Sequence, residues 1–142
     1  MRTLVTSHIH HQHGRFRQQS GPELADAGEH GTVVIGVGVD VDGSADLSYI
    51  ETAAKQISPY LTPGTVVVNK STVPVGSTRF VEQALGRSDV HVVSNPEFLR
   101  EGSAVHDFLN PDRVVIGSDD QSAAIRVAAL YIGVAAPLMV TD

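Results

Sequence analysis

Residues 65–78 read TVVVNKSTVPVGST, and this stretch decides the fold. Its first five residues form a short, β-branched apolar run, typical of a strand that is covered on both faces. Pro74 and Gly76 then favour a turn of fixed conformation. From Phe80 to Leu85 the apolar residues recur at helical spacing. The stretch therefore predicts a buried strand, a loop and a helix in succession.

The same alternation continues on both sides of this unit. Upstream, residues 33–38 (VVIGVG) form a second β-branched run, and a helix is expected from Leu47 to Leu61, where Thr62-Pro63-Gly64 ends it. Downstream we expect strands at 90–93, 113–116 and 138–140 and a helix at 121–131. Strands that alternate with helices predict right-handed crossovers and a mainly parallel sheet. The sequence thus predicts an α/β fold, a partial doubly wound (Rossmann-like) parallel sheet, over residues 32–142.

Residues 1–31 are polar and are expected to form an irregular N-terminal segment. His8, His10, His11 and His13 lie within six positions and could meet at i, i+3 on a helix. Zinc sites usually add cysteine or carboxylate ligands, and none is near. We therefore expect no metal site.

Composition excludes several classes of function. The 142 residues carry a formal net charge of −6, which argues against nucleic acid as a partner, because phosphate binding needs a basic surface. No apolar stretch approaches the roughly 18 to 20 residues that span a bilayer. We expect no membrane partner and a cytoplasmic location. These residues contain no cysteine, and so no disulfide, thiolate metal site or thiol nucleophile.

The densest chemistry lies in residues 95–117, which read NPEFLREGSAVHDFLNPDRVVIG. Asn95-Pro96 breaks any regular element. Glu97 and Glu101 would share one face if the backbone coils for a turn, with Arg100 beside Glu101. One interpretation is a binding loop, and the alternative is an ordinary solvated first turn with an intrahelical ion pair.

Both dense motifs begin where a predicted strand ends, which is where open α/β sheets bind ligands. Thr72 offers a hydroxyl there that can donate and accept, although a helix-cap or turn threonine is the alternative interpretation. Residues 36–38 provide no phosphate fingerprint, because their G-x-G lies inside a strand and does not open a helix.

The two motifs, residues 70–78 and 95–117, resemble those of the UDP-glucose/GDP-mannose dehydrogenase family, most closely its UDP-glucose 6-dehydrogenases. The motifs are long, ungapped and in the expected order. The resemblance extends from about Gly14 to the C-terminus, over the later part of the family's NAD-binding domain. The wording FLREG at residues 98–102 favours the UDP-glucose branch over the GDP-mannose branch.

The resemblance implies a function and a set of residues. The family oxidises UDP-glucose twice with NAD, giving UDP-glucuronate through a covalent thiol intermediate. It implies catalytic roles for Thr72, Glu97 and Glu101, with Thr72 and Glu101 against the cofactor. The UDP-sugar, UDP-glucose or a related nucleotide sugar, would be lined by Glu97, Phe98, Leu99, Arg100 and Glu101.

The family's catalytic cysteine and its Gly-rich phosphate turn have no counterpart in these residues. We therefore expect a truncated UDP-glucose dehydrogenase-like protein that cannot complete the reaction alone. The alternative is a non-catalytic remnant, or a nucleotide-sugar-binding half-domain that associates with itself or with a complete homologue. An apolar sheet edge without its neighbouring strands would favour such association.

Overall fold

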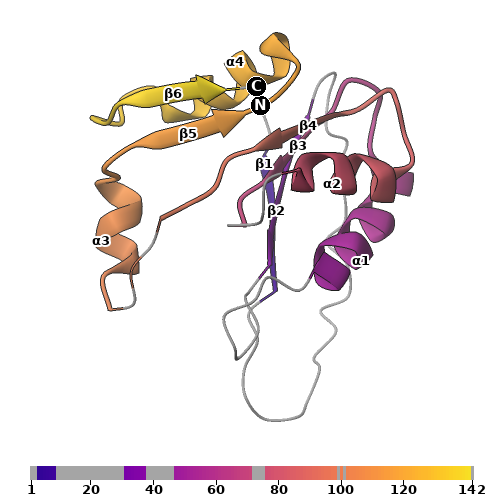
Figure 1. Cartoon of the computed structure of the whole chain (residues 1–142), viewed down its shortest axis with the longest axis horizontal. Helices are drawn as coiled ribbons and strands as arrows, with labels where there is room; N and C mark the ends of the chain where they lie inside the picture. Colours follow the sequence, from indigo (N-terminus) through magenta and orange to yellow (C-terminus); the bar gives the residue numbers. More distant parts are fainter. Residues whose placement is uncertain are drawn as a thin grey trace.

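The structure, a computed structural model, describes residues 3–8, 31–37, 47–71, 76–98, 100 and 102–141. Its centre is a six-stranded sheet in the order β1-β2-β3-β4-β5-β6 (Figure 1). The strands are β1 (Thr3–His8), β2 (Thr32–Val37), β3 (Val66–Asn69), β4 (His91–Ser94), β5 (Val114–Gly117) and β6 (Leu138–Thr141). Neighbours are parallel, except that β4 and β5 meet antiparallel at the pair Ser94 and Gly117. The predicted α/β class with a mainly parallel sheet is confirmed.

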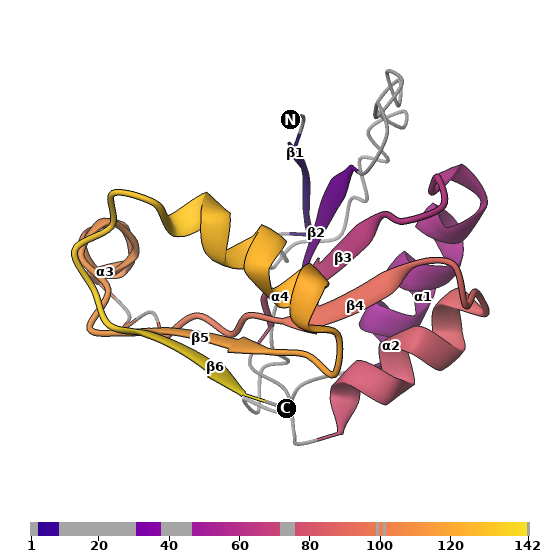
Figure 2. The same ribbon diagram turned by 90° about the horizontal axis from the view of Figure 1, so that it is seen from above.

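Helices cover both faces of this sheet. The α-helices are α1 (Leu47–Ile57), α2 (Ser77–Leu85), α3 (Ala104–Leu109) and α4 (Gln121–Ala128), and the 3-10 turns are η1 (Ser58–Tyr60) and η2 (Ala129–Tyr131). Figures 1 and 2 show α1 and α2 together on one side of β4, and α4 on the other. Helices on both faces are what buried, continuously apolar parallel strands require.

Each face has its own hydrophobic core, because successive side chains of a strand point to opposite faces. In β3, Val67 packs with Ile50 and Val81 from α1 and α2. Its neighbours Val66 and Val68 pack instead with β5 and α4. All three valines of β3 are buried, which explains why this strand carries no polar alternation.

Several elements differ from the expectation. The helix predicted to reach Leu61 ends at Ile57 and continues as η1, because Pro59 supplies no N–H to extend an α-helix. Likewise α4 ends at Ala128 and continues as η2 up to Tyr131. Helix α3 was not expected as a separate element within the 95–117 motif.

The N-terminal segment also differs. Strand β1 lies within residues 1–31, which we expected to be irregular, and it pairs with β2 from Thr3 opposite Thr32 to His8 opposite Val37. The run TLVTS is rich in β-branched residues, which favour strands. Apart from β1 and Gly31, this segment, including His10, His11 and His13, lies outside the described residues.

Over the described ranges, the structure contains no helix of the length and apolar character needed to cross a bilayer.

Candidate functional site

The carboxyl ends of β2, β3 and β4 meet at one edge of the sheet, where both sequence motifs begin. The backbone N–H of Lys70 donates to the Ile35 carbonyl at 2.8 Å, and that of Asn95 donates to the Asn69 carbonyl at 2.8 Å. Lys70 and Asn95 are therefore the first residues beyond two adjacent strands. These hydrogen bonds between neighbouring strands fix the backbones of both residues, so their side chains start from rigid positions.

The Lys70 ammonium is the centre of a polar group at this edge. Its Nζ lies 3.2 Å from the Tyr131 hydroxyl, 3.4 Å from Asn95 Oδ1 and 3.6 Å from Glu97 Oε2. A lysine has three N–H donors and no acceptor, so these three contacts match its donor capacity. The lysine side chain is 16% exposed and the Glu97 side chain 38% exposed. The ion pair therefore has one sheltered partner and one partner that reaches solvent.

Asn95 joins this group to two more elements. Its side chain is buried, and its Nδ2 donates to the Val115 carbonyl of β5 at 2.8 Å. Its Oδ1 accepts a hydrogen bond from the hydroxyl of Tyr131, at the end of η2. We call Lys70, Asn95, Glu97 and Tyr131 the strand-end cluster. It connects the ends of β3 and β4 with β5 and η2.

A cavity of about 150 Å³ opens beside the strand-end cluster, and all four of its residues line it. Typical pockets for a whole small ligand measure about 300–1,000 Å³. The opposite wall comes from the segment around α3, including Phe98, Arg100 and Arg113. The cavity is therefore smaller than a pocket that encloses a whole small ligand.

Arg100 and Asp107 shape that opposite wall. The Arg100 guanidinium makes two hydrogen bonds to the Asp107 carboxylate, at 3.1 and 2.7 Å, and the Arg100 backbone N–H adds a third at 3.0 Å. The Ser103 hydroxyl donates to the same carboxylate at 2.9 Å. These bonds, the Arg100 guanidinium first, hold the pKa of Asp107 well below its usual range. We call these bonds from Arg100 and Ser103 to Asp107 the clamp, and they tie Arg100 to α3.

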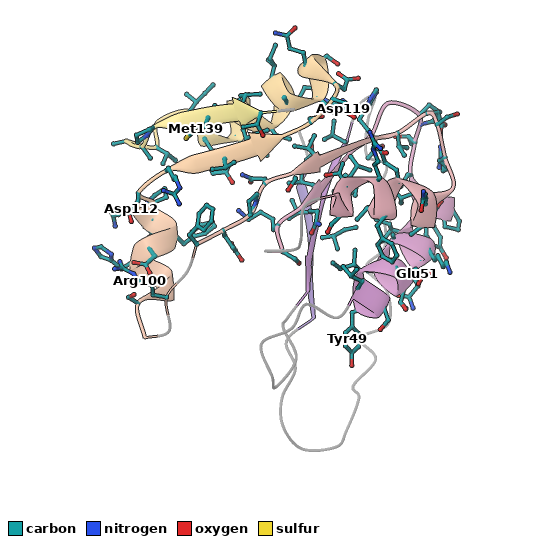
Figure 3. All side chains as sticks on the ribbon, in the orientation of Figure 1. Tyr49, Glu51, Arg100, Asp112, Asp119 and Met139 are labelled. Atoms are coloured by element: carbon teal, nitrogen blue, oxygen red, sulfur yellow. The ribbon has the colours of Figure 1, made fainter. Side chains whose placement is uncertain are left out.

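Phe98 and Arg113 complete the wall. The Arg113 guanidinium carbon lies 4.9 Å from the centre of the Phe98 ring, a cation–π contact. Phe98 is half exposed. Figure 3 shows Arg100 and Asp112 beside α3, on the opposite side of the molecule from Tyr49 and Glu51 of α1.

The structure places three of the predicted site residues, Glu97, Phe98 and Arg100, around this one cavity. Thr72, Leu99 and Glu101 lie outside the described residues. Residues 95–98 are not helical, so Glu97 does not begin a helical turn. The described partner of Arg100 is Asp107, and Lys70 pairs with Glu97. The intrahelical ion pair of the alternative interpretation is not among the described ion pairs.

Sequence reasoning did not single out Lys70, Asn95, Asp107 or Tyr131 as site residues. A signal existed for Lys70 and Asn95, because each directly follows a β-branched run. Tyr131 carries no such signal, since it lies 61 residues from Lys70.

Two further observations concern possible bound groups. Asn69, at the end of β3, is buried and its Nδ2 has no hydrogen-bond partner among the described residues, although its Oδ1 accepts from the Ser71 backbone N–H at 3.1 Å. Among the described residues, no group of three or more His, Asp or Glu side chains is arranged to hold a metal ion.

Comparison with known proteins identifies the family. The sequence profile of the UDP-glucose/GDP-mannose dehydrogenase family, NAD binding domain, matches residues 2–134. A UDP-glucose 6-dehydrogenase of Bacillus subtilis is 44% identical over 115 residues, which are 78% of this chain and 25% of that protein. A UDP-glucose 6-dehydrogenase of Rickettsia bellii is 35% identical over 142 residues, covering 96% of this chain and 32% of the relative. This chain therefore spans between a quarter and a third of these relatives.

Solved structures agree with the sequence comparison. A UDP-glucose dehydrogenase from Pyrobaculum islandicum matches with a TM-score of 0.63 and 42% identity, covering 78% of this chain and 28% of that one. A GDP-mannose dehydrogenase from Pseudomonas aeruginosa, solved as a ternary complex, matches with a TM-score of 0.62 and 28% identity, covering 79% of this chain and 29% of that one. The chain belongs to the UDP-glucose/GDP-mannose dehydrogenase family, and its residues 2–134 match the family's NAD-binding domain.

Proposed function

We propose that this chain binds UDP-glucose in this cavity, with the strand-end cluster on one side of the sugar and Phe98 and Arg100 on the other. The observation that carries the proposal is the Glu97 carboxylate, held beside Lys70 at the carboxyl ends of β3 and β4 and lining a cavity. Ligands of open α/β sheets bind at this edge. The UDP-glucose 6-dehydrogenases among the relatives support this choice of nucleotide sugar.

The chemistry of the cavity suits a sugar. A carboxylate accepts hydrogen bonds at up to about four positions, so Glu97 can accept from hydroxyl groups while it is paired with Lys70. Hexose hydroxyls are donors of this kind. The cavity volume of about 150 Å³ supports contact with part of the ligand, with other segments needed to enclose the remainder.

The proposal includes the family's substrate binding but not its complete reaction. By resemblance, Thr72, Glu97 and Glu101 would act in the NAD-dependent oxidation, with Thr72 and Glu101 contacting the cofactor. The described residues do not provide a Gly-rich strand-to-helix turn for the NAD pyrophosphate, since Gly36 and Val37 lie within β2. These 142 residues also contain no cysteine for a thioester. We therefore propose sugar binding without turnover by these residues alone.

Calorimetric titration with UDP-glucose tests the proposal. Glu97→Gln keeps the size of the side chain but removes its charge, and we expect affinity to fall about 10-fold or more, as for the loss of a charged hydrogen bond. Glu82→Gln, on the exposed face of α2, is the matched control and should bind as the unmodified chain does. Equal affinity for both variants would contradict a role for Glu97.

Two additions to this titration extend the test. A parallel titration with GDP-mannose distinguishes the two branches of the family, and we expect it to bind more weakly. NADH absorbance with UDP-glucose and NAD should show no sustained rise. Sustained NADH formation would contradict the proposal that these residues cannot turn over.

A second candidate is a half-domain that associates with a complete homologue. The exposed edge strand β6 favours it, because Leu138, Met139 and Val140 are each 41% exposed or more. An apolar edge strand is a template for pairing with another chain. Sedimentation of the chain alone tests whether it associates with itself. Sedimentation of the chain mixed with a complete UDP-glucose dehydrogenase tests whether the two associate, and a monomer in both experiments would contradict this candidate.

A further inference from the structure

Tyr131 reaches the candidate site from a distant part of the chain. It ends η2, directly after α4, and its ring packs partly buried against the core that α4 forms with β3 and β5. Its hydroxyl accepts from Lys70 Nζ at 3.2 Å and donates to Asn95 Oδ1. The ring therefore anchors the hydroxyl to the core, and Tyr131 is one of the residues that line the cavity.

Lys70 needs such anchoring more than most residues. Its ammonium sits on a flexible four-carbon stem, and fixing a long charged side chain costs rotamer entropy. Here the Tyr131 hydroxyl and Asn95 Oδ1 provide two fixed acceptors on one side of the ammonium. The third contact of the ammonium, at 3.6 Å, is the Glu97 carboxylate. Lys70 thus helps to place the Glu97 carboxylate.

We propose that Tyr131 is a positioning residue: its hydroxyl, with Asn95, fixes the Lys70 ammonium, which presents the Glu97 carboxylate to a hydroxyl group of the bound sugar. The identity of the ligand in this inference rests on the proposed function, whereas the contacts among Tyr131, Asn95, Lys70 and Glu97 do not depend on it. Tyr131 acts through Lys70.

The arrangement separates positioning from packing. Tyr131→Phe keeps the ring that packs on the core and removes the hydroxyl, so Lys70 loses one acceptor and Asn95 loses one donor. A residue with a packing role alone would tolerate this change. The matched control is Tyr60→Phe in η1, because that side chain is 67% exposed and does not line the cavity.

The first measurement needs no ligand. In chain labelled with ¹³C and ¹⁵N, the Glu97 carboxyl and Asn95 side-chain amide signals should shift in Tyr131→Phe and stay in place in Tyr60→Phe. Lys70→Met removes the ammonium and should move the Glu97 signal further. If the Glu97 signal is unchanged in both Tyr131→Phe and Lys70→Met, the inference is overturned, whether or not UDP-glucose binds.

The second measurement uses UDP-glucose and a double-mutant cycle. Tyr131→Phe should weaken binding about 3- to 10-fold in the unmodified chain. In the Glu97→Gln background it should weaken binding less than about 2-fold, because the group that it positions is no longer charged. Equal losses in both backgrounds would overturn the inference. If UDP-glucose does not bind at all, the proposed function fails, and the carboxyl signals alone decide the role of Tyr131.

Discussion

Replacing Asn95 with alanine removes the residue that joins four elements of the candidate site. The side chain is 2% exposed and takes part in three hydrogen bonds, with the Val115 carbonyl, the Tyr131 hydroxyl and the Lys70 ammonium. Truncation leaves the Val115 carbonyl and the Tyr131 hydroxyl without these partners. We expect a local loss of order at the ends of β4 and β5 together with a loss of global stability.

The size of the loss follows from the contacts. A net hydrogen bond contributes about 1 kcal/mol, and the bond to Lys70 is long at 3.4 Å and contributes less. The sum for Asn95→Ala is about 2 to 3 kcal/mol in the free energy of unfolding. With a urea slope of about 2 kcal/mol per molar, the unfolding midpoint should fall by about 1 M.

Urea unfolding followed by circular dichroism measures this difference. The control is Asn110→Ala, because the Asn110 side chain is exposed and makes a single described bond, at 3.1 Å to the His106 carbonyl. We expect the control to cost less than about 0.5 kcal/mol. A loss for Asn95→Ala that is no larger than that of the control would refute the reasoning about the strand-end cluster.

Three other predictions concern the clamp, the acid response and the core. Asp107→Asn should weaken the hold on Arg100, seen as faster amide hydrogen exchange in α3 with β3 unchanged; equal exchange in α3 would contradict the clamp. Asp107 and Asp120 have pKa values lowered in the folded chain, for Asp120 chiefly by the Ser122 hydroxyl and the Ala123 N–H. The stabilisation of the fold by these two carboxylates is therefore complete above the unfolded pKa of about 3.9 and is lost as the pH falls through the lowered pKa values. If the urea concentration at the unfolding midpoint does not decrease when the pH is lowered below 4, this sign is contradicted. Ile116→Ala, at a fully buried site, should cost about 2 to 5 kcal/mol in the free energy of unfolding. Ile132→Ala, at an 85% exposed site, should cost less than about 0.5 kcal/mol, and similar costs for the two would argue against the assigned core.

Much of the fold was predictable because its strands are buried on both faces. The run of valines at 66–68 has no polar alternation, and in the structure its members pack into two different cores. The positions of β2 to β6 therefore follow from local sequence, whereas β1 was not predicted. The exact helix ends did not, since the change from α-helix to 3-10 turn depends on single residues such as Pro59.

Helix α3 escaped prediction for a different reason. Its apolar residues Val105, Phe108 and Leu109 are all exposed, so the segment has no buried stripe to reveal a helical period. The partner of Arg100 was equally hidden. Local spacing pointed to the neighbouring glutamates, whereas the turn after Arg100 brings Asp107 to its guanidinium.

The sequence indicated where the candidate residues lie in the fold, but it did not indicate all the residues that surround the cavity. Strand ends and motif positions pointed to the carboxyl edge of the sheet, and the structure places Glu97, Phe98 and Arg100 around one cavity there, while their roles stay predictions. The contact between Tyr131 and Lys70 joins residues 61 positions apart, and no periodicity within a helix or strand encodes it. Such long-range polar contacts become visible only when the topology is known.

The most direct test of the central claim is a map of UDP-glucose binding by ¹H–¹⁵N NMR on the labelled chain. If Glu97 and its neighbours form the sugar-facing wall, increasing UDP-glucose should produce saturable shifts in the amides of Asn95, Glu97, Phe98 and Tyr131, while the amides of α1 stay in place. Shifts that are absent at millimolar UDP-glucose, or that centre on α1, would contradict the claim.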